Sequence, residues 1–374
     1  MKIIKYITLA LVLLNLPSIG LFAYGGGVGA MLSYATILML VIYYALEKKT
    51  TPNWWIFVIA MLYFIIGSLQ YYGAPMVFMM ELIKYFIFVI AGYELAKNVS
   101  TLELFVFFLI GALSVGVEAM SFTNDYGRYA GFYLNANVAG FICIYGYSTI
   151  YGLKSGTLKL LGQFVFTLMG LLTFSRTFIV IWLLLNVISL KVSIKNIRIF
   201  GIAFLIFSTL LLIDQVVGLN NPRFEQLKNI VSDDKKVSSE EISEDSRTET
   251  WAKFYDQIFE APIIGNGYGT FSGKTNAMGV HNTYLMIIGE AGILPFFLFL
   301  IYMARLFFKS FMHFKAAPYL VMQTISLAVF LLANHNFFTF YYMTFAAMWI
   351  QYQLYKLDNP EDKKEEKEEK LLEV

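Results

Sequence analysis

The chain has 374 residues, of which 58% are hydrophobic, 17% aromatic and 14% charged, with a mean hydropathy of +0.63. Soluble domains are about 25% charged, so this composition excludes an ordinary soluble protein and indicates a polytopic membrane protein. The net charge of +2 is too small to favour nucleic acid as a partner. The single cysteine, Cys143, can form no internal disulfide, and we expect it to be a small buried apolar side chain.

Apolar runs fill most of the chain, and a membrane helix needs about 20 such residues. We therefore expect an all-α fold of about twelve transmembrane helices in a single membrane domain, residues 1–374. The expected spans are residues 3–23, 28–46, 54–72, 75–96, 101–120, 137–153, 157–174, 176–191, 198–217, 282–308, 316–336 and 337–355. The first span begins like a secretory signal, but no clear cleavage pattern follows it, which favours a retained helix.

Basic residues gather in alternate short links between these spans. By the positive-inside rule both termini are then cytoplasmic, together with a charged tail at residues 357–374. The outer face receives the loop at residues 121–136 and one large extracytoplasmic loop, residues 218–281. We expect short amphipathic helices in that large loop.

Two charges interrupt the fourth expected span. Glu81 and Lys84 are three residues apart and so share a helical face. Mutual neutralisation explains them without a function, because buried charges in membrane helices usually pair. The alternative is a polar interior site.

The loop at residues 121–136 brings polar groups to the outer face. It carries Arg128, and Asn135 and Asn137 stand where the chain enters the next span. Asparagine at such a place is typical of helix capping. Alternatively, Arg128 and the two amides bind sugar hydroxyls or phosphate. In both cases we expect an ordered segment.

Arg176 lies between two apolar runs, at the expected outer boundary of the membrane. An arginine at the centre of a membrane helix costs roughly 2.5 kcal/mol or more, and less near the interface. Its guanidinium therefore needs a partner. It either reaches the lipid headgroups or faces the bundle interior and binds an anion.

The large loop changes character along its length. Residues 220–244 are polar and predict a mobile crossing. Arg247 and Trp251 then share an amphipathic helix that Pro262 ends. The tryptophan is typical of an interfacial anchor, whereas the arginine is a candidate anion-binding group.

Three glycines, Gly265, Gly267 and Gly269, follow that helix and predict a tight backbone turn. His281 and Asn282 stand where the loop re-enters the membrane. Histidine titrates near neutral pH and can take a proton from a hydroxyl, so His281 is a candidate general base, with a structural histidine as the alternative.

Two further candidates lie nearby. Glu290 is deeper in the same span as His281, and His335 is at the outer end of the eleventh span. The chain has too few scattered histidines and cysteines for a recognisable zinc cluster, and it lacks the spacing of a Gly-x-x-x-x-Gly-Lys-Ser/Thr phosphate loop. We therefore expect no metal, no cofactor and no use of ATP.

Three segments together resemble the O-antigen ligase and polymerase superfamily of bacterial polytopic membrane glycosyltransferases. They are Thr173-Phe174-Ser175-Arg176, the run from Arg247 through Trp251 to Gly267, and His281-Asn282-Thr283-Tyr284-Leu285 followed by Gly289-Glu290-Ala291-Gly292. These motifs cover about 120 residues, from 173 to 292. Outside them the resemblance is one of span number and topology.

The resemblance implies metal-independent transfer of glycan from an undecaprenyl diphosphate-linked donor at the outer face of the bacterial inner membrane. Arg176 and Arg247 then hold the donor diphosphate, and His281 is the general base on the acceptor hydroxyl. The substrate-binding residues are Arg128, Asn135, Asn137, Trp251, Gly265, Gly267, Asn282, Glu290 and His335. The polyprenyl chain enters laterally from the bilayer.

One departure separates two activities within the superfamily. In its ligases a Gly-containing motif after the His-Asn pair closes with a small or hydroxylated residue, whereas here Gly292 is followed by Pro295. This favours a polymerase of surface polysaccharide over a ligase that transfers glycan to the lipid A-core of lipopolysaccharide.

A flippase or transporter for lipid-linked sugar is the alternative from another class, because about twelve spans suit a transporter. The lack of an internal repeat and the placement of the reactive residues on one face disfavour it. A structural scaffold leaves Arg176 unexplained. The expected partners are the lipid-linked donor, an acceptor glycan or lipid A-core, and the bilayer.

Overall fold

The computed structural model describes residues 1–121, 127–217, 247–274 and 278–360, with the side chains at 211, 213–217 and 247 outside this part. Throughout these residues the regular structure is helical and includes no strand, which confirms the all-α prediction. The expected mobile crossing at residues 220–244 and most of the charged tail lie outside the described residues.

The first half of the bundle contains α1 (Lys2–Leu13), α2 (Leu16–Tyr24), α3 (Gly26–Leu46), α4 (Trp54–Ser68), α5 (Pro75–Lys97), α6 (Thr101–Ser121) and α7 (Ala136–Thr149). The second half contains α8 (Gly156–Leu172), α9 (Arg176–Val192), α10 (Arg198–Val217), α15 (Thr283–Ala291), α16 (Ile293–Met312), α17 (Pro318–Phe330) and α18 (Tyr341–Asp358). Two short helices, α13 (Arg247–Ala252) and α14 (Tyr255–Glu260), lie in the large loop, and η1 (Gly131–Tyr133), η2 (Ile150–Gly152) and η3 (Ile194–Ile197) are 3-10 turns.

Four of the described helices, α3, α5, α6 and α16, are long and apolar enough to cross a membrane, and the bent pair α1–α2 makes a fifth such segment. The protein is therefore a membrane protein, while the number of twelve crossings stays a prediction. Two expected spans are not single helices. The first is bent by 64° at Asn15 (φ 55°), and the tenth is divided between α15 and α16 at Gly292 (φ 76°), because a left-handed residue interrupts an α-helix.

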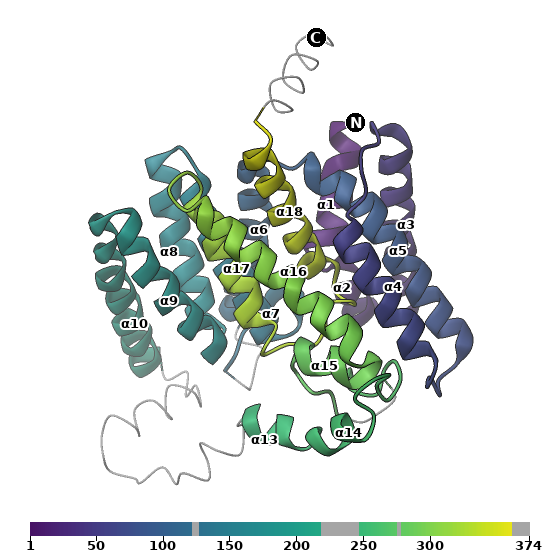
Figure 1. Ribbon diagram of the computed structural model, residues 1–374. Coiled ribbons are helices and arrows are strands. Elements are labelled where there is room, and N and C mark those ends of the chain that lie inside the picture. The colour runs from purple at the N-terminus through teal and green to yellow at the C-terminus, as the bar shows by residue number, and fades with distance from the viewer. Residues whose placement is uncertain (122–126, 218–246, 275–277, 361–374) are drawn as a thin grey trace.

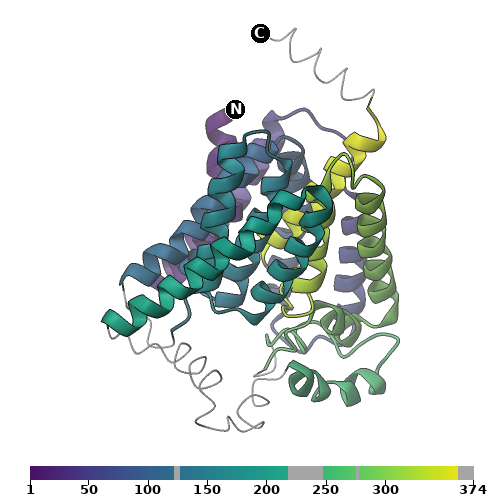
Figure 2. The ribbon, with the colours of Figure 1, turned by 90° about the vertical axis from the view of Figure 1, so that its left-hand side faces the viewer.

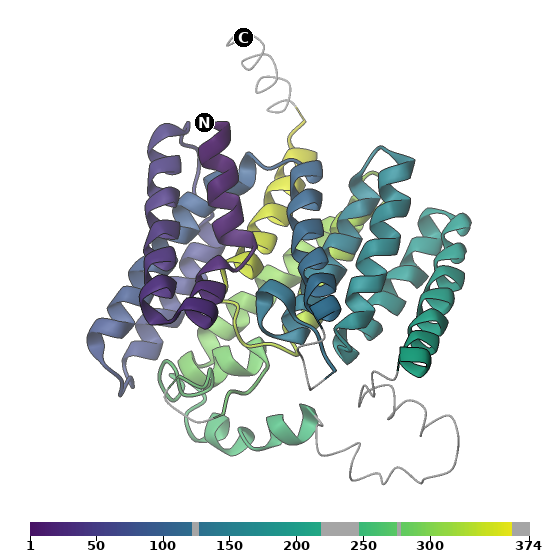
Figure 3. The ribbon, with the colours of Figure 1, turned by 180° about the vertical axis from the view of Figure 1, so that it is seen from behind.

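Helix α7 is the centre of the bundle. Every residue from 138 to 149, including Cys143, is buried, and α6, α8, α9 and α17 pack around it. Helices α1, α3 and α5 gather on one side of this centre, and α8 to α10 on the other (Figure 3). The burial of Cys143 confirms its predicted role as a core side chain.

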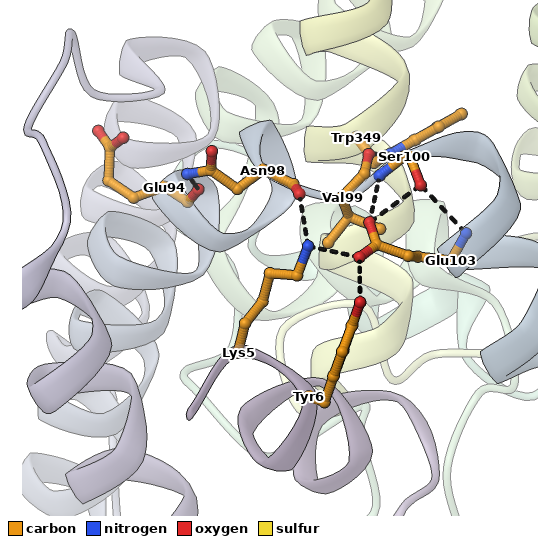
Figure 4. A network of polar contacts seen from close by, with 8 residues as sticks. All are labelled: Lys5, Tyr6, Glu94, Asn98, Val99, Ser100, Glu103 and Trp349. Atoms are coloured by element: carbon orange, nitrogen blue, oxygen red, sulfur yellow. Dashed lines mark hydrogen bonds and ion pairs between the residues drawn. The ribbon is translucent and has the colours of Figure 1, made fainter. Parts of the chain in front are cut away.

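A polar network ties α1 to the start of α6 (Figure 4). Lys5 donates to the Asn98 carbonyl at 3.1 Å and pairs with Glu103 at 2.5 Å. Ser100 and Glu103 form a capping box, in which each side chain accepts from the other residue's backbone N–H, at 3.2 Å and 2.9 Å respectively. Trp349 of α18 donates to the carbonyl of residue 99 at 2.9 Å, so the network joins three helices.

The two ends of the bundle carry different elements. The beginning of α1 and the last turn of α18 lie at one end, and α13, α14 and α15 lie at the other (Figures 1 and 2). The prediction that both termini share one side and the large loop takes the other requires this arrangement. Which side of the membrane each end faces stays a prediction.

Candidate functional site

The loop between α14 and α15 is fastened to the ends of α4 and α15 by backbone hydrogen bonds. The N–H of Asn266 donates to the Gly289 carbonyl at 2.7 Å, and that of Gly267 to the Glu290 carbonyl at 3.1 Å. The N–H of Tyr268 donates to the carbonyl of residue 67 in α4 at 2.8 Å. These backbone hydrogen bonds therefore hold the loop against the helix bundle.

Its three glycines adopt the left-handed backbone that the sequence predicts, with φ of 71° at Gly265, 94° at Gly267 and 91° at Gly269. A Cβ at Gly265 would lie 2.4 Å from the carbonyl carbon of Glu290, and one at Gly267 would lie 2.0 Å from the carbonyl oxygen of Gln70. Close packing on α15 and on the chain after α4 thus explains the first two glycines without a bound substrate.

Glu290 anchors this loop from inside. Its side chain is fully buried and accepts the backbone N–H of Phe271 at 2.9 Å, the N–H of Ser272 at 2.6 Å and the hydroxyl of Tyr63 on α4. Buried charge is tolerated where hydrogen bonds compensate it. These contacts assign Glu290 a supporting role, and direct substrate binding by it stays a prediction.

His281 and His335, which are far apart in sequence, lie against each other. Their ring centroids are 4.9 Å apart, and the backbone N–H of His281 donates to Nδ1 of His335 at 3.1 Å. A neutral imidazole that accepts at Nδ1 carries its proton on Nε2. His335 is 8% exposed, whereas His281 is half-buried and left-handed, with φ of 50°.

Asn282 caps α15. Its side chain is 3% exposed and accepts the N–H of Tyr284 at 2.9 Å and that of Leu285 at 3.2 Å. Thr283 beside it donates through its hydroxyl to the Asn334 carbonyl at 2.6 Å. The cap and this bond hold the histidine pair between α15 and the end of α17.

A second cluster, called the arginine cluster below, lies at the beginning of α7 and α9. Arg128 donates through Nη2 to Oδ1 of Asn137 at 2.8 Å and through Nε to the Thr173 carbonyl at 3.3 Å. Ser175 donates to the same Asn137 oxygen at 3.0 Å. Asn135 caps α7, accepting two backbone N–H groups at 2.9 and 3.2 Å, which confirms the capping interpretation for that residue.

Arg176 is the first residue of α9 and is exposed. Within the described part of the chain, no hydrogen bond or ion pair holds its guanidinium. The beginning of a helix carries partial positive charge, so the fixed dipole and the guanidinium at this place both favour an anion.

The remaining two loop candidates are only partly defined. Arg247 begins α13, but its side chain lies outside the described residues. Trp251 is half-buried against the core, and its Nε1 is buried with no hydrogen-bond partner among the described residues. The helix predicted for both of them is divided into α13 and α14, which ends before Pro262 as expected.

The histidine pair and the arginine cluster are connected through α7 and α17. Phe141, one turn after Asn137 on α7, stacks on Phe330 at the end of α17 with ring centroids 4.6 Å apart. The chain then continues to His335. The helix beginnings that carry the two clusters, those of α7, α9 and α15, lie at the end of the bundle away from the termini (Figure 1).

An apolar groove of about 920 Å³ opens beside the arginine cluster. It lies between α6, α8 and α10 and reaches Tyr129 and Phe174, the neighbours in sequence of Arg128 and Ser175. Its lining includes Met120, Leu161, Phe164, Leu168, Leu205 and Ile206. Sequence reasoning missed this groove, because apolar side chains between helices look the same whether they pack or leave space.

A smaller pocket of about 380 Å³ lies at the beginning of α5. There Glu81 accepts the hydroxyl of Tyr268 at 2.5 Å and the ammonium of Lys274 at 2.7 Å. Burial, followed by the charge of Glu81, raises the pKa of Tyr268, so its hydroxyl stays protonated as the donor. The predicted Glu81–Lys84 pair is wrong, since Lys84 donates instead to Ser33 at 3.0 Å; the loop supplies a nearer cation.

Comparison with known proteins relates part of the chain to a described family. Residues 161–300 match the family model described as O-antigen ligase, and no curated protein matches the chain. The matched segment contains Arg176, the glycine turn, His281 and Glu290, whereas Arg128 and His335 lie outside it. This segment is therefore similar to the O-antigen ligase family, and the match supports an assignment to the O-antigen ligase and polymerase superfamily.

Proposed function

We propose that this protein is a metal-independent membrane glycosyltransferase that moves glycan from an undecaprenyl diphosphate-linked donor to an acceptor sugar, and that it polymerises surface polysaccharide. Ligation of the glycan to lipid A-core is the second candidate. The observation that carries the proposal is the apolar groove that ends beside the arginine cluster. A donor that carries a diphosphate at the end of a long apolar tail needs an apolar surface for the tail next to a positively charged site for the diphosphate.

In this proposal, the polyprenyl chain occupies the groove between α6, α8 and α10. The diphosphate is assigned to the end of the groove that reaches Phe174, two residues before Arg176 at the N-terminus of α9. Arginine matches diphosphate oxygens with two parallel bonds. Arg128 is held by Asn137 and Thr173 and adds positive charge beside the leaving group. Arg247, whose side chain lies outside the described residues, is assigned to the same diphosphate in this proposal on its sequence position alone.

The proposed reaction is a single displacement. The acceptor hydroxyl oxygen attacks the anomeric carbon of the donor, and the bond from that carbon to the diphosphate oxygen breaks. His281 takes the hydroxyl proton, and undecaprenyl diphosphate leaves with its charge stabilised by the arginines. The proposed site is on the outer face of the bacterial inner membrane, with both termini cytoplasmic, because the basic links favour that orientation.

The groove can be tested with donors that differ only in tail length. Purified protein in lipid nanodiscs should show a lower KM for the full-length polyprenyl donor than for a short-chain analogue. Leu161→Trp, which fills the groove, should reduce that difference at least about tenfold, because each buried CH₂ contributes about 0.8 kcal/mol. Leu183→Trp is the matched control on exposed α9 surface outside the groove. Equal tail dependence in both variants would refute the assignment.

Arg176→Lys should lower transfer about tenfold or more, because lysine keeps the charge but loses the planar fork, and one charge-assisted hydrogen bond contributes about 1.5 kcal/mol or more. The measurement is the initial rate of transfer at varied concentrations of lipid-linked donor and saturating acceptor. The effect is expected mainly in the KM for the donor. Arg198→Lys, at the first residue of α10, is the control. Wild-type kinetics in Arg176→Lys would remove this residue from donor binding.

The same assay separates the proposed function from its rival. A flippase would move lipid-linked sugar across liposome membranes without making a glycosidic bond. Product analysis by mass spectrometry, with free glycan and lipid A-core offered as competing acceptors, also distinguishes polymerisation from ligation.

A further inference from the structure

The residues that line the pocket at the beginning of α5 have no role in the proposed donor site. It is lined by Tyr71, Gly73, Ala74, Val77, Glu81, Tyr268 and Lys274. Its volume of about 380 Å³ is near the lower end of the roughly 300–1,000 Å³ typical of small-ligand sites. It lies against the loop that continues to His281 and is separate from the apolar groove.

The charges in this pocket cancel. Lys274 binds Oε2 of Glu81 at 2.7 Å, and Tyr268 donates to the same oxygen at 2.5 Å. One positive and one negative group in contact give no net attraction for a diphosphate. A neutral ligand with many hydroxyls suits such a pair better, because hydroxyls can donate to the carboxylate and accept from the ammonium.

Aromatic surface completes the pocket. The rings of Tyr71 and Tyr268 are 6.0 Å apart and inclined by 55°, and Lys274 lies over the Tyr268 ring at 4.8 Å. Gly73 lets Tyr71 fold back, since a Cβ there would lie 2.2 Å from the Tyr71 hydroxyl oxygen. Aromatic rings offer an apolar body next to polar groups, which matches a pyranose ring with one apolar face and hydroxyls at its edge.

The pocket is also coupled to the proposed base. Tyr268 and Lys274 belong to the loop that the carboxylate of Glu290 anchors, and the Phe271 carbonyl of that loop accepts the N–H of Val280 at 2.8 Å, directly before His281. A ligand bound here would therefore share a scaffold with the histidine pair.

From these observations we propose that the Glu81–Tyr268–Lys274 pocket binds one neutral sugar unit of the acceptor glycan. That the sugar belongs to the acceptor glycan rests on the proposed function, whereas the binding of a neutral sugar in this pocket does not depend on it. Glu81 and Lys274 bind hydroxyls, and Tyr71 and Tyr268 pack on the ring.

Binding can be measured without any donor. The purified full chain in nanodiscs is mixed with methyl glycosides of glucose, galactose, mannose, N-acetylglucosamine and rhamnose, and saturation-transfer NMR reports contact. At least one glycoside should bind to the wild type. Val77→Phe fills the pocket without touching the three polar groups, and it should weaken binding at least about tenfold. Met79→Phe, on the same helix and 47% exposed against 55% for Val77, should leave binding unchanged.

Glu81→Gln tests the role of the carboxylate in the pocket and should weaken the binding of the same glycoside. The proposal is overturned if no glycoside in the panel binds, if Val77→Phe binds as well as Met79→Phe, or if inorganic phosphate displaces the sugar, which would indicate an anion site.

A kinetic measurement separates this inference from the proposed function. With donor and acceptor present, Val77→Phe should raise the KM for the acceptor and leave the KM for the donor unchanged. An equal rise in both would contradict an acceptor subsite. Glycoside binding that Val77→Phe abolishes, in a protein that transfers no glycan, would instead refute the proposed function and leave the sugar pocket in place.

Discussion

Replacement of His281 by alanine is expected to lower the rate of glycan transfer by about 10²- to 10⁴-fold, the usual contribution of a positioned general base. The proposed donor site uses a different cluster, at the start of α7 and α9, so donor affinity should stay close to that of the wild type. A loss in kcat at unchanged donor KM identifies a group that acts in the chemical step.

A substitution of the neighbouring histidine, His335, provides a second test of this role. His335 accepts the backbone N–H of His281 at 3.1 Å, so His335→Ala should disturb the position of His281 and cause a smaller loss. His313, which contacts Asp358 at 2.8 Å at the opposite end of the bundle, is the matched control. The wild-type rate should also fall in mildly acidic solution, since an imidazolium cannot accept a proton. Near-equal turnover by wild type and His281→Ala would exclude His281 as the base.

Glu290→Ala is expected to release the loop between α14 and α15. The substitution removes the acceptor for two backbone N–H groups and the Tyr63 hydroxyl. Each buried donor left unsatisfied costs about 1–3 kcal/mol, so the loss for the three is at least about 3 kcal/mol if no water enters. Hydrogen exchange at residues 271 and 272 should accelerate by about a hundredfold or more.

Glu260→Ala, which removes an exposed carboxylate from α14, is the control for loss of charge alone. Transfer should fall with Glu290→Ala as well, because Tyr268 and Lys274 lose their support, whereas the bundle itself should remain folded. Unchanged exchange at residues 271 and 272 would contradict the anchoring role.

Much of the fold could be predicted from the sequence, because apolar runs of membrane length leave few alternatives to helices. Helices lie at the expected places, yet Asn15 and Gly292 divide two expected spans. A hydropathy window averages over such breaks. The positive backbone φ at these positions depends on contacts made elsewhere, such as the Asn15 amide donating to the carbonyl of residue 132 at 3.2 Å.

The candidate site was less predictable, because its residues meet only after folding. The turn formed by Gly265–Gly269 follows from residue type, since glycine tolerates left-handed backbone. The pairing of His281 with His335 spans 54 residues and has no local signal. The Glu81–Lys84 prediction failed because helical spacing shows which charges can meet, not that Lys274 arrives from a distant loop.

The path of the loop between α14 and α15 is held mainly by its backbone. Asn266, Gly267 and Tyr268 fasten it through their N–H groups, and any residue except proline has an N–H group to offer. Side chains that line the loop's outer surface can therefore change without moving the chain. If the proposed sugar pocket is correct, its sugar preference can change by substitution at a few of these positions, while the glycines and Glu290 keep the backbone before His281 in place.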